Sequence, residues 1–157
     1  MKKEQLGQLI LTSEDTLYHV AKTLLHSDAD CADAIQETIV KAFTGLHTLQ
    51  QDSYAKTWLV RILINECYTL MRREKRLVSL EEYPCQETAS EPADYSDLYE
   101  AVQKLPPDIR ICIVLYYLEG YSVKETAKIL KISESAVKNR LARARTRMRK
   151  DLRQAAT

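Results

Sequence analysis

The stretch Ser133–Lys150, SESAVKNRLARARTRMRK, decides the fold of the C-terminal part of this chain. Val137, Leu141, Ala144 and Met148 recur in it at helical spacing, which predicts one apolar side that packs on protein. Seven basic residues surround this stripe: Lys138, Arg140, Arg143, Arg145, Arg147, Arg149 and Lys150. Such a face is either simply solvated or built to bind an anionic partner.

The preceding segment, SVKETAKIL at residues 122–130, predicts a shorter helix, because Ser122 and Glu125 have the spacing of a capping box. Ser133 is the expected N-cap of the longer helix. Two such helices have the dimensions of a helix-turn-helix, whose second helix enters the DNA major groove. The alternative is a helix hairpin with a solvated basic face.

Counting 100° per residue from the apolar stripe gives the face that would meet DNA. It carries Ser135, Lys138, Asn139, Ala142, Arg143, Thr146 and Arg149. Asn and Arg side chains can form bidentate hydrogen bonds with adenine and guanine edges, whereas Lys138, Arg147 and Arg149 suit phosphates. The predicted DNA-binding set is Ser135, Lys138, Asn139, Arg143, Arg147 and Arg149.

Composition predicts an all-α protein of one or two small domains. The 157 residues are 45% hydrophobic, include only three glycines, and nowhere alternate apolar and polar residues as a strand would. No apolar run approaches the roughly 20 residues of a membrane span, and the N-terminus lacks the pattern of a secretion signal, so we expect a cytoplasmic protein. The four cysteines form no C-x-x-C pair, and we expect buried thiols, no metal site and no cofactor.

Charge is distributed unevenly along the chain. Residues 81–100 contain seven acids and no base, whereas residues 121–157 contain eleven bases and three acids. The asymmetry favours nucleic acid as the partner of the C-terminal half. The acidic segment 79–94 has two prolines and little periodicity, which predicts a flexible linker between an N-terminal domain, 1–78, and a C-terminal domain, 95–157.

The N-terminal domain is predicted to be a bundle of three helices, with Ser13, Asp28 and Ser53 at their starts. The second helix has an expected apolar stripe of Ala32, Ile35, Ile39, Ala42, Phe43 and Leu46. Another of its faces carries a polar row: Asp33, Gln36, Glu37 and Lys41. By itself, such a row is most simply a solvated face.

In the third helix, basic residues lie on both sides of a tryptophan in the sequence. Basic side chains can bind phosphates, and an aromatic ring can stack on an unpaired base. Trp58 can equally be a core residue, and its position in the sequence leaves both roles open. The predicted set is Lys56, Trp58, Arg61, Asn65, Arg72 and Arg73.

Two long stretches resemble the extracytoplasmic-function (ECF) group of the sigma-70 family. They are LPPDIRICIVLYYLEGYSVKETAKILKISESAVKNRLARARTRMRK, which is similar to the family's C-terminal domain, and SDADCADAIQETIVKAF with KTWLVRILINECYTLMRREKR, which are similar to its N-terminal domain. The resemblance implies a polymerase specificity subunit that recognises and helps to open promoters, and not an enzyme.

The resemblance also implies roles for the predicted sets. The polar row, Asp33, Gln36, Glu37 and Lys41, would bind a coiled coil of the largest subunit of the RNA polymerase core. The third helix and the loop HTLQQDSY would grip the minus-ten element, and the last helix would read the minus-thirty-five element. A dedicated anti-sigma factor is implied as a further partner, and the acidic linker would either occupy polymerase channels or act as a tether.

This sequence departs from the family pattern at two positions. Family members often have Gly where this chain has Lys131, which suggests a strained turn, and Asp where it has Thr69, which affects the minus-ten grip. Two rivals are a stand-alone helix-turn-helix regulator and an enzyme. The first would need a ligand-sensing or dimerising domain that the sequence does not indicate, and the second a cluster of catalytic residues.

Overall fold

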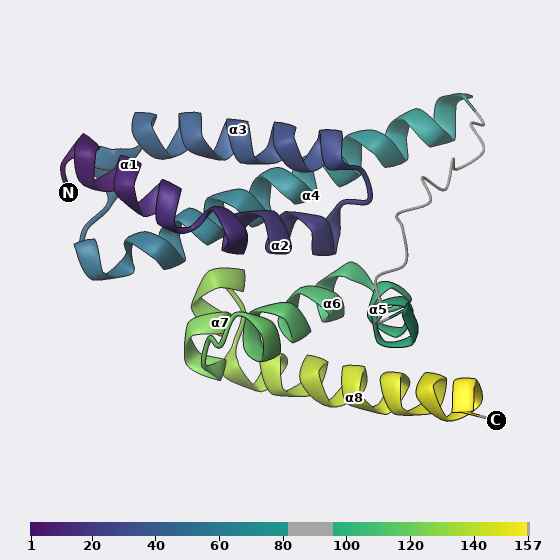
Figure 1. The fold of residues 1–157 in the computed structure, drawn as a ribbon. Helices are drawn as coiled ribbons and strands as arrows, with labels where there is room; N and C mark the ends of the chain where they lie inside the picture. Colours follow the sequence, from purple (N-terminus) through teal and green to yellow (C-terminus); the bar gives the residue numbers. More distant parts are fainter. Residues whose placement is uncertain (82–95, 157) are drawn as a thin grey trace. The chain divides into compact units, whose positions relative to one another are not determined.

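The computed structural model describes the backbone of residues 1–81 and 96–156, and the side chains of residues 1–75 and 100–153. Within these residues every regular element is a helix, which confirms the all-α prediction (Figure 1). The chain divides into two compact units, Met1–Thr88 and Ala89–Thr157. The predicted linker starts at residue 79. The last helix of the first unit continues to Glu81, and residues 82–94 of that linker lie outside the described residues.

Within its described residues, 1–81, the first unit contains four α-helices, one more than predicted. They are α1 (Lys3–Thr12), α2 (Glu14–Leu24), α3 (Asp28–Thr44) and α4 (Ala55–Glu81), with the 3-10 turns η1 (Leu46–Thr48) and η2 (Asp52–Tyr54) before α4. The extra helix, α1, is held by Leu6 and Ile10, which are both buried. The long helix α4 packs against α2 and α3, and its buried Leu59, Val60 and Leu63 lie at the centre of the unit. Burial of these apolar side chains is the main force that holds the bundle together.

The buried side of α3 differs from the predicted stripe. Its fully buried residues are Cys31, Ala34, Thr38 and Ala42, whereas Ala32 and Phe43 are exposed. The Thr38 hydroxyl donates to the Ala34 carbonyl at 2.7 Å, so this polar side chain is satisfied inside its own helix. Small side chains on this face let α3 lie close against α4. The predicted stripe was wrong for Ala32 and Phe43, because a stripe chosen by hydrophobicity leaves out the polar Thr38, which lies on the buried side.

The predicted helix starts in the first unit were also inexact. Ser27, and not Asp28, is the N-cap of α3, because the Ser27 hydroxyl accepts from the Asp30 amide at 3.0 Å. Ser13 precedes α2 but its buried side chain makes no capping hydrogen bond. The turn η2 comes before α4, which therefore begins two residues after Ser53.

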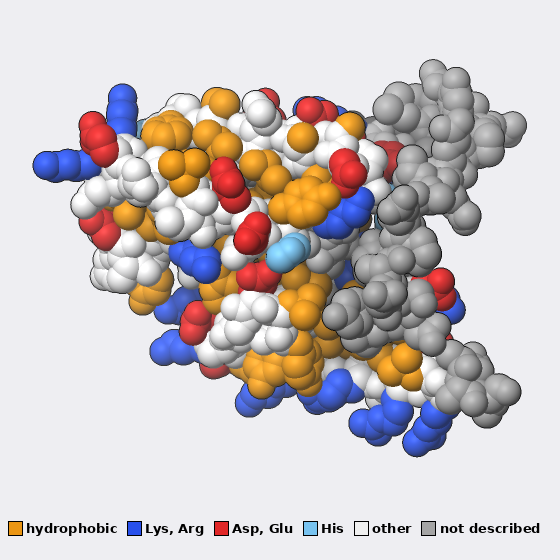
Figure 2. Space-filling model, viewed as in Figure 1, with side chains coloured by type: hydrophobic (Ala, Val, Ile, Leu, Met, Phe, Trp, Pro, Cys, Tyr) orange, Lys and Arg blue, Asp and Glu red, His pale blue; other side chains and the backbone are white. Residues whose placement is uncertain are grey.

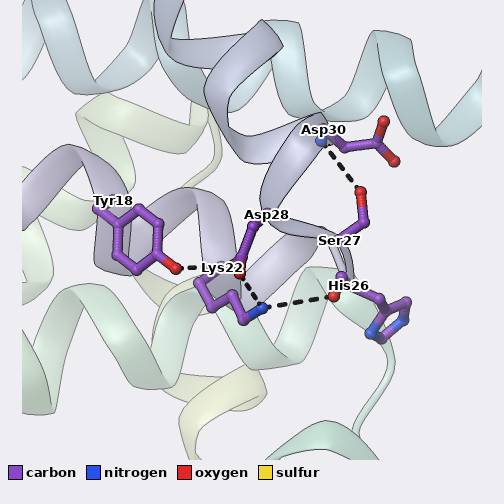
Figure 3. A network of polar contacts seen from close by, with 6 residues as sticks. All are labelled: Tyr18, Lys22, His26, Ser27, Asp28 and Asp30. Atoms are coloured by element: carbon purple, nitrogen blue, oxygen red, sulfur yellow. Dashed lines mark hydrogen bonds and ion pairs between the residues drawn. The ribbon is translucent and has the colours of Figure 1, made fainter. Parts of the chain in front are cut away.

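A polar network joins the end of α2 to the start of α3 (Figure 3). Asp28 Oδ1 accepts from Lys22 Nζ at 2.9 Å and from the Tyr18 hydroxyl at 2.8 Å. Lys22 Nζ also donates to the His26 carbonyl at 3.4 Å. Lys22 lies in the last turn of α2 and Asp28 in the first turn of α3, so each charge also complements a helix dipole. The network fixes the corner at which the chain turns into α3.

This network makes a testable contribution to pH-dependent stability. The hydrogen bonds from Lys22 and Tyr18 lower the pKa of Asp28, and the bond to Asp28 raises the pKa of Lys22. A lowered carboxyl pKa stabilises the folded state above the ordinary Asp value and loses this effect as the pH falls through the folded-state pKa. We therefore expect Asp28→Asn to lower the melting temperature at neutral pH and to match the parent in strong acid. Asp30→Asn is the control, because it removes a charge from the same helical turn without breaking the ion pair; an equal loss in both variants would assign the effect to the helix dipole alone.

The second unit contains the helices α5 (Ser96–Gln103), α6 (Pro107–Ile113), α7 (Val123–Leu130) and α8 (Glu134–Ala156). A single π-helical turn, η3 (Val114–Leu118), extends α6, and Gly120 with φ 75° ends it as predicted. The buried core joins α6, α7 and α8. Its members are Leu105, Ile109, Cys112, Ile113, Ala127, Val137, Leu141 and Ala144.

The helix-turn-helix has the predicted caps. Ser122 Oγ accepts from the Glu125 amide at 3.0 Å and donates to Glu125 Oε1 at 3.1 Å, and Ser133 Oγ accepts from the Ala136 amide at 3.0 Å. Between them, Lys131 ends α7 in the left-handed region with φ 57° and ψ 44°. It is the one non-glycine residue with positive φ in the described part of the chain. The expected left-handed backbone at Lys131 is confirmed, and the strain that it implies stays a prediction.

We expect Lys131→Gly to stabilise the second unit by up to about 1 kcal/mol, because glycine adopts the left-handed conformation without the clash of a Cβ atom. Greater chain entropy of glycine in the unfolded state offsets part of the gain. Thermal or urea unfolding measures the difference. Lys131→Ala is the matched control, since it removes the lysine side chain and keeps the Cβ; if Ala stabilises as much as Gly, or if Gly destabilises, backbone strain at this position is not the cause.

Candidate functional site

Helix α8 has one buried side and one exposed side, as its sequence predicts. Val137, Leu141 and Ala144 are buried, and Met148 is half-buried against the same core. All six predicted DNA-binding residues are exposed: Ser135, Lys138, Asn139, Arg143, Arg147 and Arg149. Basic side chains line the lower edge of the view in Figure 2, along the course that α8 takes in Figure 1. The helix thus offers a largely polar and positive surface of several turns.

Two of the seven basic residues of this stretch are engaged within their own unit. Arg140 is half-buried beside Cys112. Burial raises the pKa of the Cys112 thiol, and the positive charge of Arg140 partly opposes this rise. Arg145 Nη1 donates to the Tyr117 hydroxyl at 3.0 Å. The Tyr117 ring in turn stands edge-on to Tyr116, with ring centroids 4.9 Å apart. Neither Arg140 nor Arg145 belongs to the predicted DNA-binding set.

The polar row on α3 divides into two parts. Asp33, Gln36 and Glu37 are exposed, and no hydrogen bond or ion pair engages them among the described residues. Val40 lies one turn further along the same face and is 60% exposed. Lys41 differs from the rest of the row, because its ammonium group binds Glu66 of α4. The face therefore presents carboxylates followed by an apolar side chain.

The predicted residues of α4 lie at different depths. Lys56, Asn65, Arg72 and Arg73 are exposed, and Trp58 and Arg61 are half-buried. Trp58 is close to the end of α3, since a Cβ atom at Gly45 would lie 4.0 Å from its ring. Both roles of Trp58, core packing and base contact, stay predictions.

Thr69, one of the two departures from the family pattern, has a defined role in α4. Its hydroxyl donates to the Asn65 carbonyl at 3.0 Å and accepts from Arg72 Nη2 at 3.3 Å. The threonine thus orients one of the two adjacent arginines without a charge of its own. Sequence reasoning did not find this contact, which needs the helical spacing and a suitable arginine rotamer together.

The described residues give no evidence of a metal site or of a membrane-spanning helix. These contain no group of three or more potential metal ligands, and none of their helices is both long and apolar enough to cross a membrane. Cys31, Cys67 and Cys112 are buried free thiols, and burial raises the pKa of Cys67 to about 12. Thiols of this kind are poor nucleophiles and poor metal ligands at neutral pH.

Comparison with known protein families assigns each unit separately. Residues 9–77 match sigma-70 region 2, and residues 95–148 match sigma-70 region 4. The first match spans the α3 row and most of α4, and the second spans the helix-turn-helix. The two regions follow one another along the chain in the order that the resemblance implied.

Relatives and solved structures agree with this assignment. The chain is 31% identical over 144 residues to the ECF RNA polymerase sigma factor SigM of Mycobacterium tuberculosis, covering 90% of this chain and 74% of that protein. It is 27% identical to the RNA polymerase sigma factor SigV of Bacillus subtilis, covering 95% of each. The sigma factor RpoE from Bartonella quintana, solved in complex with the anti-sigma factor NepR, superposes with a TM-score of 0.84 at 29% identity, covering 96% of this chain and 98% of that one. Proteins of this family initiate transcription and are not enzymes. The chain belongs to the ECF group of the sigma-70 family of RNA polymerase sigma factors.

Proposed function

We propose that this sigma factor binds its partners through three surfaces on two domains, 1–78 and 95–157, which the acidic segment 79–94 joins. A face of α3 binds the polymerase core, α4 holds the minus-ten element, and α8 reads the minus-thirty-five element. The observation that carries the proposal is that α3 has an exposed carboxylate row and α8 an exposed basic face, each inside its own sigma-70 region.

On α8, the roles follow from side-chain chemistry. Ser135, Asn139 and Arg143 lie on the outer face in the first part of the helix, the part that reaches base edges in a helix-turn-helix. Asn and Arg carry the bidentate donors and acceptors that distinguish adenine and guanine. Lys138, Arg147 and Arg149 flank them and bind phosphates, which position the helix without reading sequence.

On α4, the six residues Lys56, Trp58, Arg61, Asn65, Arg72 and Arg73 form the minus-ten surface. Exposed basic side chains near both ends of the described part of α4 suit the phosphates of a single strand. The half-buried Trp58 ring between them offers an aromatic surface to an unpaired base. Capture of an unstacked base shifts the duplex toward melting, so no catalytic residue is needed.

On α3, Asp33, Gln36 and Glu37 face a basic coiled coil of the largest core subunit. Carboxylates on such a face raise the association rate and set orientation as well as affinity. Val40, which is 60% exposed on the same face, adds an apolar contact one turn further along.

An anti-sigma factor is the second protein partner that we propose. Solved relatives include RpoE with the anti-sigma factor NepR, at 29% identity, and CnrH with the cytosolic domain of CnrY, at 27% identity and a TM-score of 0.73. The site of action is the cytoplasm, where RNA polymerase works.

Sedimentation of the purified chain with and without core polymerase tests the proposal. We expect the chain to migrate alone as a small monomer and to move with the core when both are mixed. A chain that dimerises and never joins the core would instead be a stand-alone regulator that uses the same helix-turn-helix.

A further inference from the structure

Glu37 and Lys41 have the spacing of an intrahelical ion pair on α3. A Glu four residues before a Lys is the favoured orientation for such a pair on a helix surface. In the structure, however, the Lys41 ammonium group binds Glu66 of α4, which is 25 residues away in sequence. The interaction expected from sequence alone is therefore replaced by one between helices.

Burial explains why Glu66 is the preferred partner. Its side chain is 10% exposed, whereas the Glu37 carboxylate lies on the open face of α3. A buried carboxylate without a partner is costly, and an exposed pair contributes little. Lys41 reaches Glu66 while most of its own side chain stays in solvent, at 56% exposure. Lys41 thus pairs with the more buried of the two carboxylates, which gains more from an ion pair.

We propose that Glu66 is a positioning residue that holds Lys41 away from Glu37 and so keeps the α3 face negative for its basic partner. The inference rests on the proposed binding of the polymerase core by this face. It also gives Lys41 a role in an ion pair within the chain, whereas the sequence analysis placed Lys41 among the residues that contact the polymerase core. If Lys41 were released, it would neutralise Glu37 and present a like charge to the partner, which weakens association.

Two variants that share one substitution test this role. Glu66→Met removes the carboxylate and keeps a straight, apolar side chain that suits a buried helical site. The double variant Glu66→Met with Lys41→Gln also removes the released charge. We expect Glu66→Met to bind core polymerase roughly threefold to tenfold more weakly at low salt, with the loss shrinking as salt is raised. We expect the double variant to bind like the parent, because a neutral glutamine in place of Lys41 leaves the row acidic.

The double variant also separates positioning from stability, because any effect of Glu66→Met on folding is common to both variants. Melting curves of both, measured beside core titrations, make this comparison direct. Rescue by Lys41→Gln supports the inference. A double variant that binds as weakly as Glu66→Met would show that the loss does not come from the released Lys41 charge, and one that binds more weakly would show that Lys41 itself supports core binding. Either result, or parental affinity in Glu66→Met, would overturn the positioning role. If replacing both Asp33 and Glu37 by Lys also leaves binding unchanged, the proposed core-binding face itself is wrong.

Discussion

Replacement of both Asp33 and Glu37 by Lys is expected to lower the affinity for core RNA polymerase by about a hundredfold or more. Truncating one member of a close interfacial charge pair typically costs about 2 to 5 kcal/mol, and charge reversal costs at least as much. About 2.7 kcal/mol already corresponds to a hundredfold change in the dissociation constant. The effect is large because two positions, one turn apart on α3, would both repel a basic partner.

Folding should survive this double replacement. Asp33 and Glu37 are exposed, and within the described residues neither forms a hydrogen bond or ion pair. Surface substitutions of this kind usually change the free energy of unfolding by about half a kcal/mol either way. Core titration paired with a circular-dichroism melt distinguishes lost binding from lost structure. A variant that binds the core as well as the parent would remove α3 from the interface.

The second large effect concerns the outer face of α8. We expect Asn139→Ala and Arg143→Ala each to cost about 1 to 3 kcal/mol at a particular promoter base pair, and to relax the preference at that pair. Both side chains are exposed and lie away from the buried stripe of Val137 and Leu141, so they are free to reach a base. Competition between promoter fragments that differ at single base pairs measures the loss.

Arg149→Ala is the matched comparison on the same helix. It should weaken binding to all sequences alike and reduce the slope of log affinity against log salt by about one, as expected for one lost phosphate contact. If Asn139→Ala, Arg143→Ala and Arg149→Ala all lose affinity equally on every sequence, the division between base-reading and phosphate-binding residues is wrong.

The second unit could be predicted well because its signals are local. Val137, Leu141 and Ala144 repeat on one helical face, and the capping residues Ser122 and Ser133 make the hydrogen bonds that their spacing indicates. Even the positive φ of Lys131 follows from the resemblance to chains with glycine there. Local capping and periodicity depend on few distant contacts, so they survive in the folded protein.

The first unit was predicted less well because its details depend on contacts between helices. Ser27 and Asp28 are adjacent and both are good capping residues, so sequence could not choose between them. Thr38 is buried although it is polar, because its hydroxyl donates to the Ala34 carbonyl, so a stripe defined by hydrophobicity leaves it out. The ion pair between Lys41 and Glu66 joins two helices, and helical spacing instead favours Glu37 as the partner of Lys41.

Transcription from promoter DNA with purified core polymerase, followed by mapping of the transcript starts, tests the central claim most directly. The account predicts that core with this chain initiates at a discrete set of starts that share upstream elements, and that core alone does not. It also predicts that the variant with Lys at positions 33 and 37 loses all of these starts. Starts that do not depend on the chain, or a chain that binds the promoter without changing where the core initiates, would contradict it.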